Sequence, residues 1–521
     1  MFSRTHDFAL ATASGVLFAL SFPTFGRAAF GWIALAPLLV AIAPSRQSPA
    51  SLSLARAFAL GLTSGIVYFT GTLYWITRVM AVYGGLKWWV AVLVNAALIG
   101  YLALFPALFA VVMRRLLFSL GGTALVAAPL VWVATELGRT HLFTGFPWVL
   151  LGYSQAAVLP IAQLASVLGV YGVSALVASV SAVAALVVVG STEAGDRVQI
   201  HSPRPPWIAV VLVGAVVMLT AVWGSVRAAR AEWTRAGDPV RVGIIQGNVD
   251  QQEKWNPSRA ASIFENYLSM TRQTIGEGAE LVLWPESSTP FFFEEDRRDA
   301  ERVRTLARQA RVPILLGSDQ IQRGTPTKYY NAAFLVRADG MTAGVYRKMH
   351  LVPFGEYVPL KRLLFFAAPL VEAVSDFSPG ETPQLLSVNG HLISTAICYE
   401  VVYPNLVRGF VRGGSELLTT ITNDAWFGRT SAPYQHFEQA SMRAIEEGRY
   451  LVRAANTGIS GIVDPYGRVL VQSDIFQPAV IVRQARFLRA TTIYARTGDV
   501  FAYASVVITA AMLLLARRRI Q

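Results

Sequence analysis

The stretch "STAICYEVVYP", residues 394–404, holds the only cysteine among 521 residues. An apolar run leads into Cys398, and a Tyr-Glu pair follows it, which is typical of a buried strand that ends where the chain leaves a sheet. Further β-rich runs, "VRVGIIQGN", "ELVLWPES", "VPILLGSD", "AAFLVRADG" and "SELLTTITND", alternate with segments of helical period between residues 239 and 490. This alternation predicts an α/β domain of about 250 residues, large enough to bury a full core.

The chain as a whole is too apolar for an ordinary soluble protein, because only 15% of its residues are charged and 54% are hydrophobic. Apolar stretches that could cross a bilayer as helices, which takes about 20 residues, recur before the α/β domain. We predict seven spans there and one after the domain, at 8–24, 27–43, 54–76, 86–112, 116–137, 156–190, 207–224 and 500–516. Glycine and proline interrupt the first two spans, which indicates a hairpin of tilted helices.

Lysine and arginine in short loops indicate the orientation, since they favour the cytoplasmic side. With the N-terminus inside, the inner segments hold Arg4, Arg46, Arg56, Arg114, Arg115, Arg197, Arg204 and the arginines at 517–519, whereas the outer loops hold Arg27, Arg78, Lys87 and Arg139. We therefore expect a transmembrane domain of about seven helices at 1–224, an extracytoplasmic domain at 225–498, and a helix with a basic cytoplasmic tail at 499–521.

The net charge of +13 does not indicate nucleic-acid binding. Residues 225–521 hold 34 Lys/Arg against 28 Asp/Glu, and residues 1–224 hold 11 against 4. The excess lies at the flanks of the predicted spans and forms no basic stripe for phosphates. A single cysteine also excludes an internal disulfide and a cysteine-rich zinc site.

Polar residues follow three apolar strands of the predicted domain at the point where each strand ends. Glu286 follows "LVLW", Cys398 follows "STAI", and Asn423 and Asp424 follow "TTIT". Ligands bind at the carboxyl ends of strands in α/β sheets, so these residues are candidates for a site. A loop-like segment, "YRKMHLVPFGEYVP", adds Lys348 and Glu356.

These residue types suit covalent acyl transfer. A free thiol has a pKa of about 8.5 and attacks poorly until a base takes its proton or a cation stabilises the thiolate. Glu286 can act as that base, and Lys348, with a backbone N–H after Cys398, can stabilise the oxyanion. Each residue alone has an ordinary explanation: Cys398 as a small buried hydrophobe, Glu286 as a turn or cap residue, and Lys348 as a solvated neighbour of Arg347.

Together, in the order Glu, Lys, Cys with separations of 62 and 50 residues, the motifs "WPES", "KMHLVPFGEYVP", "ICYEVVYP" and "TNDAWFG" resemble the carbon-nitrogen hydrolase (nitrilase) superfamily. With the predicted spans, the chain resembles more closely the apolipoprotein N-acyltransferase family of the bacterial inner membrane. The stretch "FTGFPWVLLGYSQ", residues 143–155 in a predicted outer loop, is also similar to that family. The resemblance implies a nitrilase-like α-β-β-α sandwich that faces the periplasm, beside a multi-span α-helical membrane domain.

The resemblance implies that Glu286 is the general base, Lys348 the oxyanion-stabilising lysine and Cys398 the nucleophile. It also implies supporting or substrate-binding roles for four further residues, which are Glu356, Trp255, Tyr399 and Glu400. Glu356 would orient or charge-balance Lys348, and Trp255 would face lipid or substrate. The family needs no metal and no cofactor.

The implied reaction is ping-pong transfer of an acyl chain from a phospholipid, typically phosphatidylethanolamine, to the thiol and then to the N-terminal amine of a diacylglyceryl apolipoprotein. One alternative is a membrane-anchored amidase or nitrilase of small amides. Another is a transporter with an appended domain. The transporter alternative is disfavoured because Lys87, Arg114 and Arg115 lie at the edges of the predicted spans, whereas transporters carry polar pathway residues within their spans.

Several features have two interpretations. The apolar segments 290–293 and 363–371 can pack in the core or cover the site, and the second can do so as a membrane-dipping arm through Phe365 and Phe366. His350 is expected to make structural hydrogen bonds rather than a Cys-His dyad.

For two further sets of charged residues, the sequence predicts a location but no functional role. Arg443, Arg449 and Arg453 are expected on a solvated or salt-bridged helix face with neighbouring glutamates. Glu136 and Arg139 are expected at the end of the fifth span, facing the outer surface.

Overall fold

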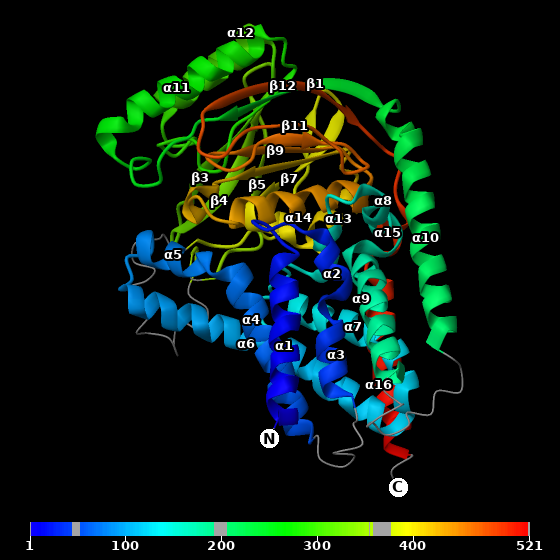
Figure 1. The fold of residues 1–521 in the computed structure, drawn as a ribbon. Helices are drawn as coiled ribbons and strands as arrows, with labels where there is room; N and C mark the ends of the chain where they lie inside the picture. The colour runs from blue at the N-terminus through cyan, green and yellow to red at the C-terminus, as the bar shows by residue number, and fades with distance from the viewer. Residues whose placement is uncertain (1, 44–52, 192–205, 354, 358–376, 519–521) are drawn as a thin grey trace. The chain divides into compact units, whose positions relative to one another are not determined.

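The computed structural model describes residues 2–43, 53–191, 206–353, 355–357 and 377–518 (Figure 1). The chain divides into two compact units, each of which is described by itself. One unit contains Met1–Thr77, Trp88–Arg230 and Thr497–Gln521, and the other contains Arg78–Lys87 and Ala231–Arg496. The first unit is helical and the second is α/β, as the sequence predicts.

The helical unit is built from long apolar helices joined by short ones. They are α1 (Phe2–Leu20), α2 (Ala28–Ala34), α3 (Ala36–Ile42), α4 (Leu54–Leu73), α6 (Trp88–Leu120), η1 (Gly121–Ala127), α7 (Ala128–His141), η2 (Leu151–Gln155), α8 (Leu159–Ala162), α9 (Ala165–Ser191), α10 (Pro206–Arg230) and α16 (Val500–Arg518). Helix α5 (Trp75–Val82) leads into the segment Arg78–Lys87 of the other unit.

Five stretches of the described residues are long and apolar enough to cross a membrane. They are Leu54–Leu73, Trp88–His141, Ala165–Val189, Trp207–Thr234 and Val500–Arg517, and Ala28–Ile42 is a shorter apolar stretch. The second predicted span is two short helices, because Pro37 in the first turn of α3 has no N–H to continue α2. The predicted span 156–190 becomes α8 and a later helix, α9, which is kinked at Gly169 with φ +67°.

The predicted break at residues 113–115 is wrong. Helix α6 continues through Arg114 and Arg115 to Leu120, where Gly121 adopts φ +65°. The Arg114 guanidinium is buried and donates to the carbonyl of Ile42, the last residue of α3. An arginine can therefore remain inside the helical unit because it satisfies a carbonyl at a helix C-terminus.

The α/β unit contains two six-stranded sheets. The first has the order β12-β1-β2-β3-β4-β5 and comprises β12 (Ala479–Phe487), β1 (Asp238–Gln246), β2 (Leu281–Leu283), β3 (Ile314–Gln322), β4 (Lys328–Val336) and β5 (Thr342–Arg347). The second has the order β11-β10-β9-β8-β7-β6 and comprises β11 (Val469–Gln472), β10 (Gly461–Val463), β9 (Leu451–Ala455), β8 (Leu417–Thr422), β7 (His391–Ile397) and β6 (Leu386–Val388). In each sheet three neighbouring strands are parallel: β1, β2 and β3, and β7, β8 and β9.

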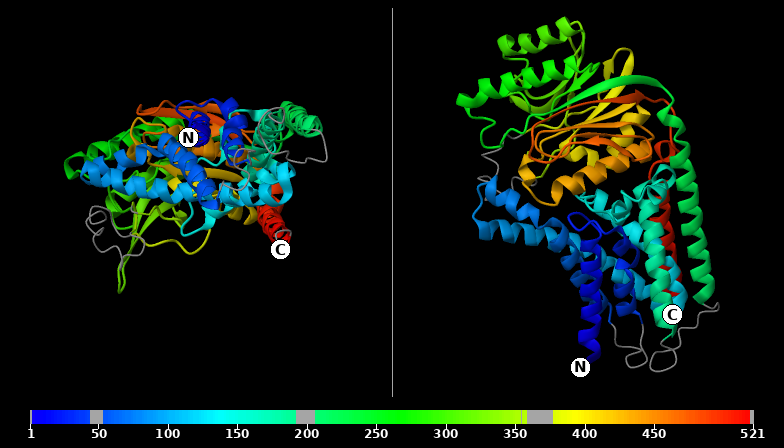
Figure 2. Two further views of the ribbon diagram at one scale, coloured as in Figure 1. Left: turned by 60° about the horizontal axis from the view of Figure 1, so that its bottom comes forward. Right: turned by 45° about the horizontal axis from the view of Figure 1, so that its top comes forward.

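Helices cover the outer face of each sheet, which gives the expected α-β-β-α order of layers. Helices α11 (Pro257–Gly276) and α12 (Arg297–Ala310) lie on the first sheet, and α13 (Pro404–Arg412) and α14 (Ala432–Glu447) lie on the second (Figure 1). Figure 2 presents the same layers from two further directions. Shorter helices complete the unit: η4 (Glu232–Thr234), η6 (Cys398–Val402), η7 (Asp424–Phe427) and α15 (Ile493–Thr497).

The outer core of the first sheet fixes the chain that leads to Glu286. Helix α11 presents Tyr267 and Thr271 one turn apart on its buried face. The Trp284 ring stacks on Tyr267, with 5.1 Å between ring centroids, and its Nε1–H donates to the Thr271 hydroxyl at 2.9 Å. Phe293 is fully buried in the same core, so core packing is the correct interpretation for that part of the segment 290–293.

Candidate active site

Strand β3 holds the loop that carries Glu286, which follows β2, by a close approach of the two backbones. The N–H of Gly317 on β3 donates to the Pro285 carbonyl at 3.2 Å, and the Gly317 carbonyl accepts from the N–H of Ser288 at 2.8 Å. A Cβ atom at residue 317 would lie 2.5 Å from the Pro285 carbonyl oxygen. Only glycine therefore lets β3 hold the loop on both sides of Glu286.

The Glu286 carboxylate is held from both sheets. Its Oε1 accepts from Asn331 Nδ2 at 2.7 Å and from Lys348 Nζ at 3.4 Å, and both of these residues belong to the first sheet or its connections. Its Oε2 accepts from the backbone N–H of Asn423, directly after β8 of the second sheet, at 2.8 Å. The side chain is nearly buried, so these contacts fix its position.

Lys348 directly follows β5 and is 1% exposed. Its ammonium lies 2.9 Å from the Glu356 carboxylate, which also accepts from Asn331 Nδ2 at 2.9 Å and from the Val352 N–H at 2.8 Å. Burial lowers the pKa of Lys348, but the charges of Glu356 and Glu286 outweigh it and raise the pKa above its usual range. The ammonium therefore stays protonated between two carboxylates.

Cys398 begins η6, directly after β7, with a positive φ of +53° and an exposure of 9%. Burial and the charge of Glu286 raise the pKa of the thiol well above its usual range, whereas the charge of Lys348 and a hydrogen bond from Thr422 oppose this shift. The sulfur thus interacts electrostatically with both other residues of the predicted set. The thiol is neutral at rest and needs a base to become a nucleophile.

Glu400 connects the cysteine turn to the lysine loop. Its carboxylate accepts from the Ile397 N–H at 2.7 Å, the Tyr346 hydroxyl at 2.7 Å, the Met349 N–H at 2.7 Å and the His350 N–H at 3.1 Å. Burial raises the pKa of Glu400 to about 7, although these hydrogen bonds oppose the shift. Glu400 thus acts on the positions of both loops.

The remaining predicted residues differ in exposure. Tyr399 is buried beside the His350 and Tyr403 rings, with centroids 5.9 and 5.1 Å away. Trp255 is 49% exposed, and the Lys254 ammonium lies 6.0 Å from its ring centroid. The structure thus brings six of the seven residues into one buried network, and it places Trp255 at its exposed margin.

Two side chains that contribute to the site, those of Asn331 and Lys254, were not predicted as site residues, whereas Asn423 was a candidate at the end of a strand. Asn331 donates to both carboxylates from the middle of β4, and the backbone of Asn423 holds Glu286. Lys254 is 5% exposed and donates to the Glu286 carbonyl at 3.3 Å. Burial lowers the pKa of Lys254 to about 8, against the charges of Glu286 and others. Its place beside Trp255 was the one sequence signal that could have indicated Lys254.

The histidine that contacts the backbone of Cys398 is His436, not the one beside Lys348. The His350 ring packs against Tyr403, 3.9 Å between centroids, and burial together with the charge of Lys348 lowers the pKa of His350 to about 4. It is therefore neutral and packed against an aromatic ring. His436 on α14 instead places Nε2 3.2 Å from the Cys398 carbonyl oxygen.

The prediction that three arginines lie on a solvated or salt-bridged helix face is wrong in part. Arg443 and Arg449 are buried rather than solvated, and Arg453 lies on β9 rather than on the helix. The salt-bridged alternative is correct for Arg443, which pairs with Glu446 at 3.0 Å, because a buried guanidinium requires a partner. The proposed arm at 363–371, with Phe365 and Phe366, lies outside the described residues.

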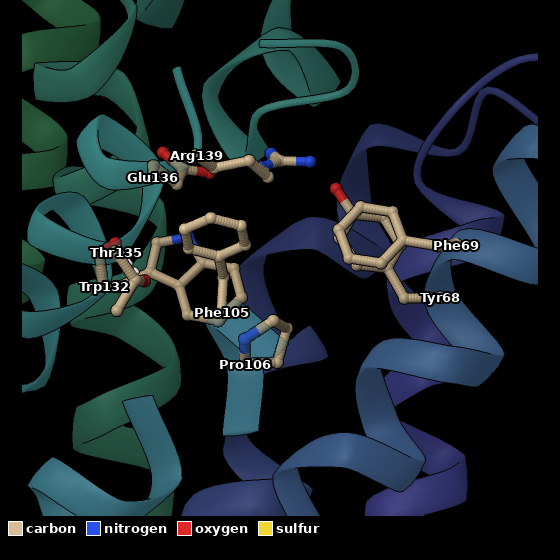
Figure 3. A pocket seen from close by; sticks show the side chains of 8 residues that line it. All are labelled: Tyr68, Phe69, Phe105, Pro106, Trp132, Thr135, Glu136 and Arg139. Carbon is tan, nitrogen blue, oxygen red and sulfur yellow. Dashed lines mark hydrogen bonds between the residues drawn. The ribbon is translucent and has the colours of Figure 1, made fainter. Parts of the chain in front are cut away.

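Glu136 and Arg139 are also not at an outer surface. Both are buried in α7, where they line a pocket with Tyr68, Phe69 and Trp132 (Figure 3). Oε1 of Glu136 accepts from the Leu151 N–H at 2.7 Å, and Arg139 donates to the Trp148 carbonyl at 3.0 Å.

This network secures the segment 143–155 within the helical unit. The argument that charges are lacking within the spans is therefore wrong, because these charges, like Arg114, are satisfied inside the unit rather than placed at span edges.

Comparison with known proteins adds independent findings. Residues 14–183 match the model of the apolipoprotein N-acyltransferase N-terminal domain, and residues 241–492 match that of carbon-nitrogen hydrolase. The chain is 42% identical to the apolipoprotein N-acyltransferase of Geobacter metallireducens over 98% of this chain and 96% of the relative. It is 35% identical to that of Methylococcus capsulatus over 94% and 92%. Among solved structures, it is similar to a nitrilase-superfamily amidase of Nesterenkonia AN1, with 20% identity and a TM-score of 0.40 over 52% of this chain and 97% of that one.

Proposed function

This chain belongs to the apolipoprotein N-acyltransferase family, and on that premise we propose that Glu286, Lys348 and Cys398 transfer a fatty acyl chain from a phospholipid to a lipoprotein amine. One observation carries the assignment: the only cysteine of the chain lies beside a buried carboxylate and ammonium that are 3.4 Å apart. Thiol, base and cation are the parts that covalent acyl transfer requires.

In the first half-reaction, Glu286 takes the proton of the Cys398 thiol while the sulfur attacks the ester carbonyl of the phospholipid. Lys348 and the N–H of Tyr399 donate to the oxyanion of the tetrahedral intermediate. The carbon–oxygen bond to glycerol then breaks, and Glu286 returns the proton to the leaving alkoxide. A lysophospholipid departs and the acyl chain remains as a thioester.

In the second half-reaction, the neutral N-terminal amine of the diacylglyceryl-cysteine attacks the thioester. Glu286 takes a proton from the attacking nitrogen and passes it to the departing sulfur, which restores the neutral thiol. The raised pKa of Cys398 suits this step, because a sulfur that binds its proton firmly is not left as a charged thiolate in a buried site. The site thus ends each cycle as it began.

We further propose phosphatidylethanolamine as the donor and the bacterial inner membrane as the location, with the α/β unit in the periplasm. The distribution of Lys and Arg over short loops supports this orientation. Trp255 is a candidate contact for the lipid because half of its surface is exposed beside the site.

Intact mass spectrometry of the full chain tests the assignment. Incubation with phosphatidylethanolamine in mixed detergent micelles should add one acyl mass to the wild type, and a diacylglyceryl lipopeptide should remove it. Cys398→Ala should show neither change while it keeps the wild-type melting temperature. Turnover by Cys398→Ala at the wild-type rate would contradict the covalent mechanism, and hydrolysis of small amides without lipid acylation would favour a membrane-anchored amidase.

A further inference from the structure

An imidazole lies behind the cysteine turn, outside the three residues of the proposed mechanism. His436 is fully buried in α14, and its Nε2 lies 3.2 Å from the Cys398 carbonyl oxygen. On the other side of the ring, Nδ1 lies 2.9 Å from Arg453 Nη2 and 3.0 Å from Asp424 Oδ1. Arg453 Nη2 also donates to Asp424 Oδ2 at 2.8 Å.

The contact with Cys398 requires a hydrogen on Nε2 of His436, because a carbonyl oxygen can only accept. Arg453 Nη2 has two hydrogens, so it can donate one to Asp424 and the other to Nδ1 of the imidazole. Burial and the charge of Arg453 hold the pKa of His436 below its usual range, so the ring is neutral. Its single hydrogen is then on Nε2 and is donated to the Cys398 carbonyl.

That hydrogen bond fixes the direction of a neighbouring N–H. The carbonyl of Cys398 and the N–H of Tyr399 belong to one planar trans peptide, so they point in opposite directions. Because the carbonyl faces His436, the Tyr399 N–H points away from it. The φ of +53° at Cys398 is an unfavourable conformation for a residue other than glycine, so the turn needs support from its surroundings.

We propose that His436 is a positioning residue for the oxyanion-binding peptide: it holds the Cys398 carbonyl so that the Tyr399 N–H is aimed at the oxyanion before substrate arrives. This inference rests on the proposed role of Cys398 as nucleophile. Arg453 and Asp424 support the imidazole from behind, and a Cβ atom at Gly458 would lie 2.1 Å from Asp424 Oδ2, so a glycine is required there.

The helix that follows Cys398 offers a competing explanation. A 3₁₀ helix directs its carbonyls along its axis by i→i+3 bonds, and a carbonyl oxygen can accept two hydrogen bonds. If η6 alone sets the peptide plane, loss of the imidazole donor will leave the oxyanion site intact.

Two reactions of the same sulfur separate these explanations. Acylation by phosphatidylethanolamine passes through an oxyanion, whereas alkylation by iodoacetamide displaces iodide and forms none. The rate of each is measured by intact mass on the full chain in detergent, and the ratio of acylation to alkylation is compared among variants. A misfolded fraction exposes the same thiol and is alkylated in a separate, faster phase, so the ratio is taken from the slower phase of the folded protein.

We expect the ratio to fall roughly 10- to 100-fold in His436→Leu, which is less than the roughly 100- to 1,000-fold cost of removing an oxyanion donor, because the N–H is misaligned rather than removed. His436→Gln, which offers an amide N–H at a similar reach, should recover most of it. The Michaelis constant for the lipid should change little in either variant, because the ground-state ester does not need the aligned N–H.

Two results would overturn the proposal. A wild-type ratio in His436→Leu would assign the peptide plane to η6 alone. An equal fall of both rates would mean that His436 acts on the thiol itself. Failure of the wild type to form any thioester on Cys398 is a different outcome, since it would refute the proposed function and not only the role of His436.

Discussion

Replacement of Glu356 by glutamine isolates the contribution of the second carboxylate at the site. The change keeps the shape of the side chain but removes a charge 2.9 Å from the Lys348 ammonium. Two unit charges at this distance attract by on the order of 6 kcal/mol at an effective dielectric constant of about 20. Removal of one partner of a buried ion pair destabilises a protein by about 3–5 kcal/mol. For a unit of this size, a melting temperature roughly 10 °C lower is expected.

The same variant should slow acylation. With Glu356 neutral, the ammonium has Glu286 alone as a counter-ion, 3.4 Å away, and binds it more tightly, so Glu286 is less available to take the thiol proton. We expect thioester formation to slow roughly 10- to 100-fold, within the contribution of general base catalysis. The assays are thermal unfolding in detergent and intact mass after exposure to phosphatidylethanolamine.

Glu265→Gln is the matched control. Glu265 pairs with Arg302 on the exposed surface of α11 and α12, and its side chain is 53% exposed. An exposed pair contributes little, so this variant should melt and acylate like the wild type. If Glu356→Gln also behaved like the wild type in both assays, the second carboxylate would not balance the charge of Lys348, and the electrostatic reasoning would be wrong.

Three further predictions concern the surroundings of the site. Gly317→Ala should slow acylation at least tenfold without preventing folding, because its methyl group displaces the Glu286 loop, and a displacement of about 1 Å can reduce a rate 100-fold. The pKa of Glu400 is about 7 in the folded protein, against 4.5 for the ordinary group, so the folded state binds more protons than the unfolded state between these pH values. The free energy of unfolding should therefore fall by up to about 3 kcal/mol as the pH rises from 4.5 to 7. Melting curves of Glu400→Gln should lack this dependence on pH. Lys254→Met removes a cation whose charge interacts with Cys398, so the pH profile of thiol alkylation should move to higher pH; an unmoved profile would mean that Lys254 does not act on the sulfur.

The sequence predicts the parts of the site that follow strands. Glu286 and Cys398 each come shortly after an apolar run, and these runs are strands, whereas Lys348 was predicted on a loop-like segment and directly follows β5. Asn331 could not be predicted in this way, because it lies within an ordinary strand and its role depends on which side chains meet across the sheet. His436 gave no signal either, since its contact depends on the packing of α14 against the cysteine turn.

In the helical unit, the sequence did not predict where the charged side chains lie. Hydropathy locates apolar stretches, but it does not determine whether an arginine among them ends a helix or is satisfied inside the unit. Arg114 and Arg139 are buried because carbonyls at a helix end and in the 143–155 segment accept their hydrogens. These acceptors lie outside the helix that carries each arginine, so they can be identified only once the folded unit is known.

The position of the Glu286 carboxylate depends on how the two sheets lie against each other, because its hydrogen-bond donors come from both. If warming or a poorly matched detergent let one sheet slip slightly against the other, Oε1 and Oε2 would be pulled by donors that no longer move together. Catalytic competence should then disappear before any strand melts, so inactivation at moderate temperature would report a loosened sandwich rather than an unfolded one.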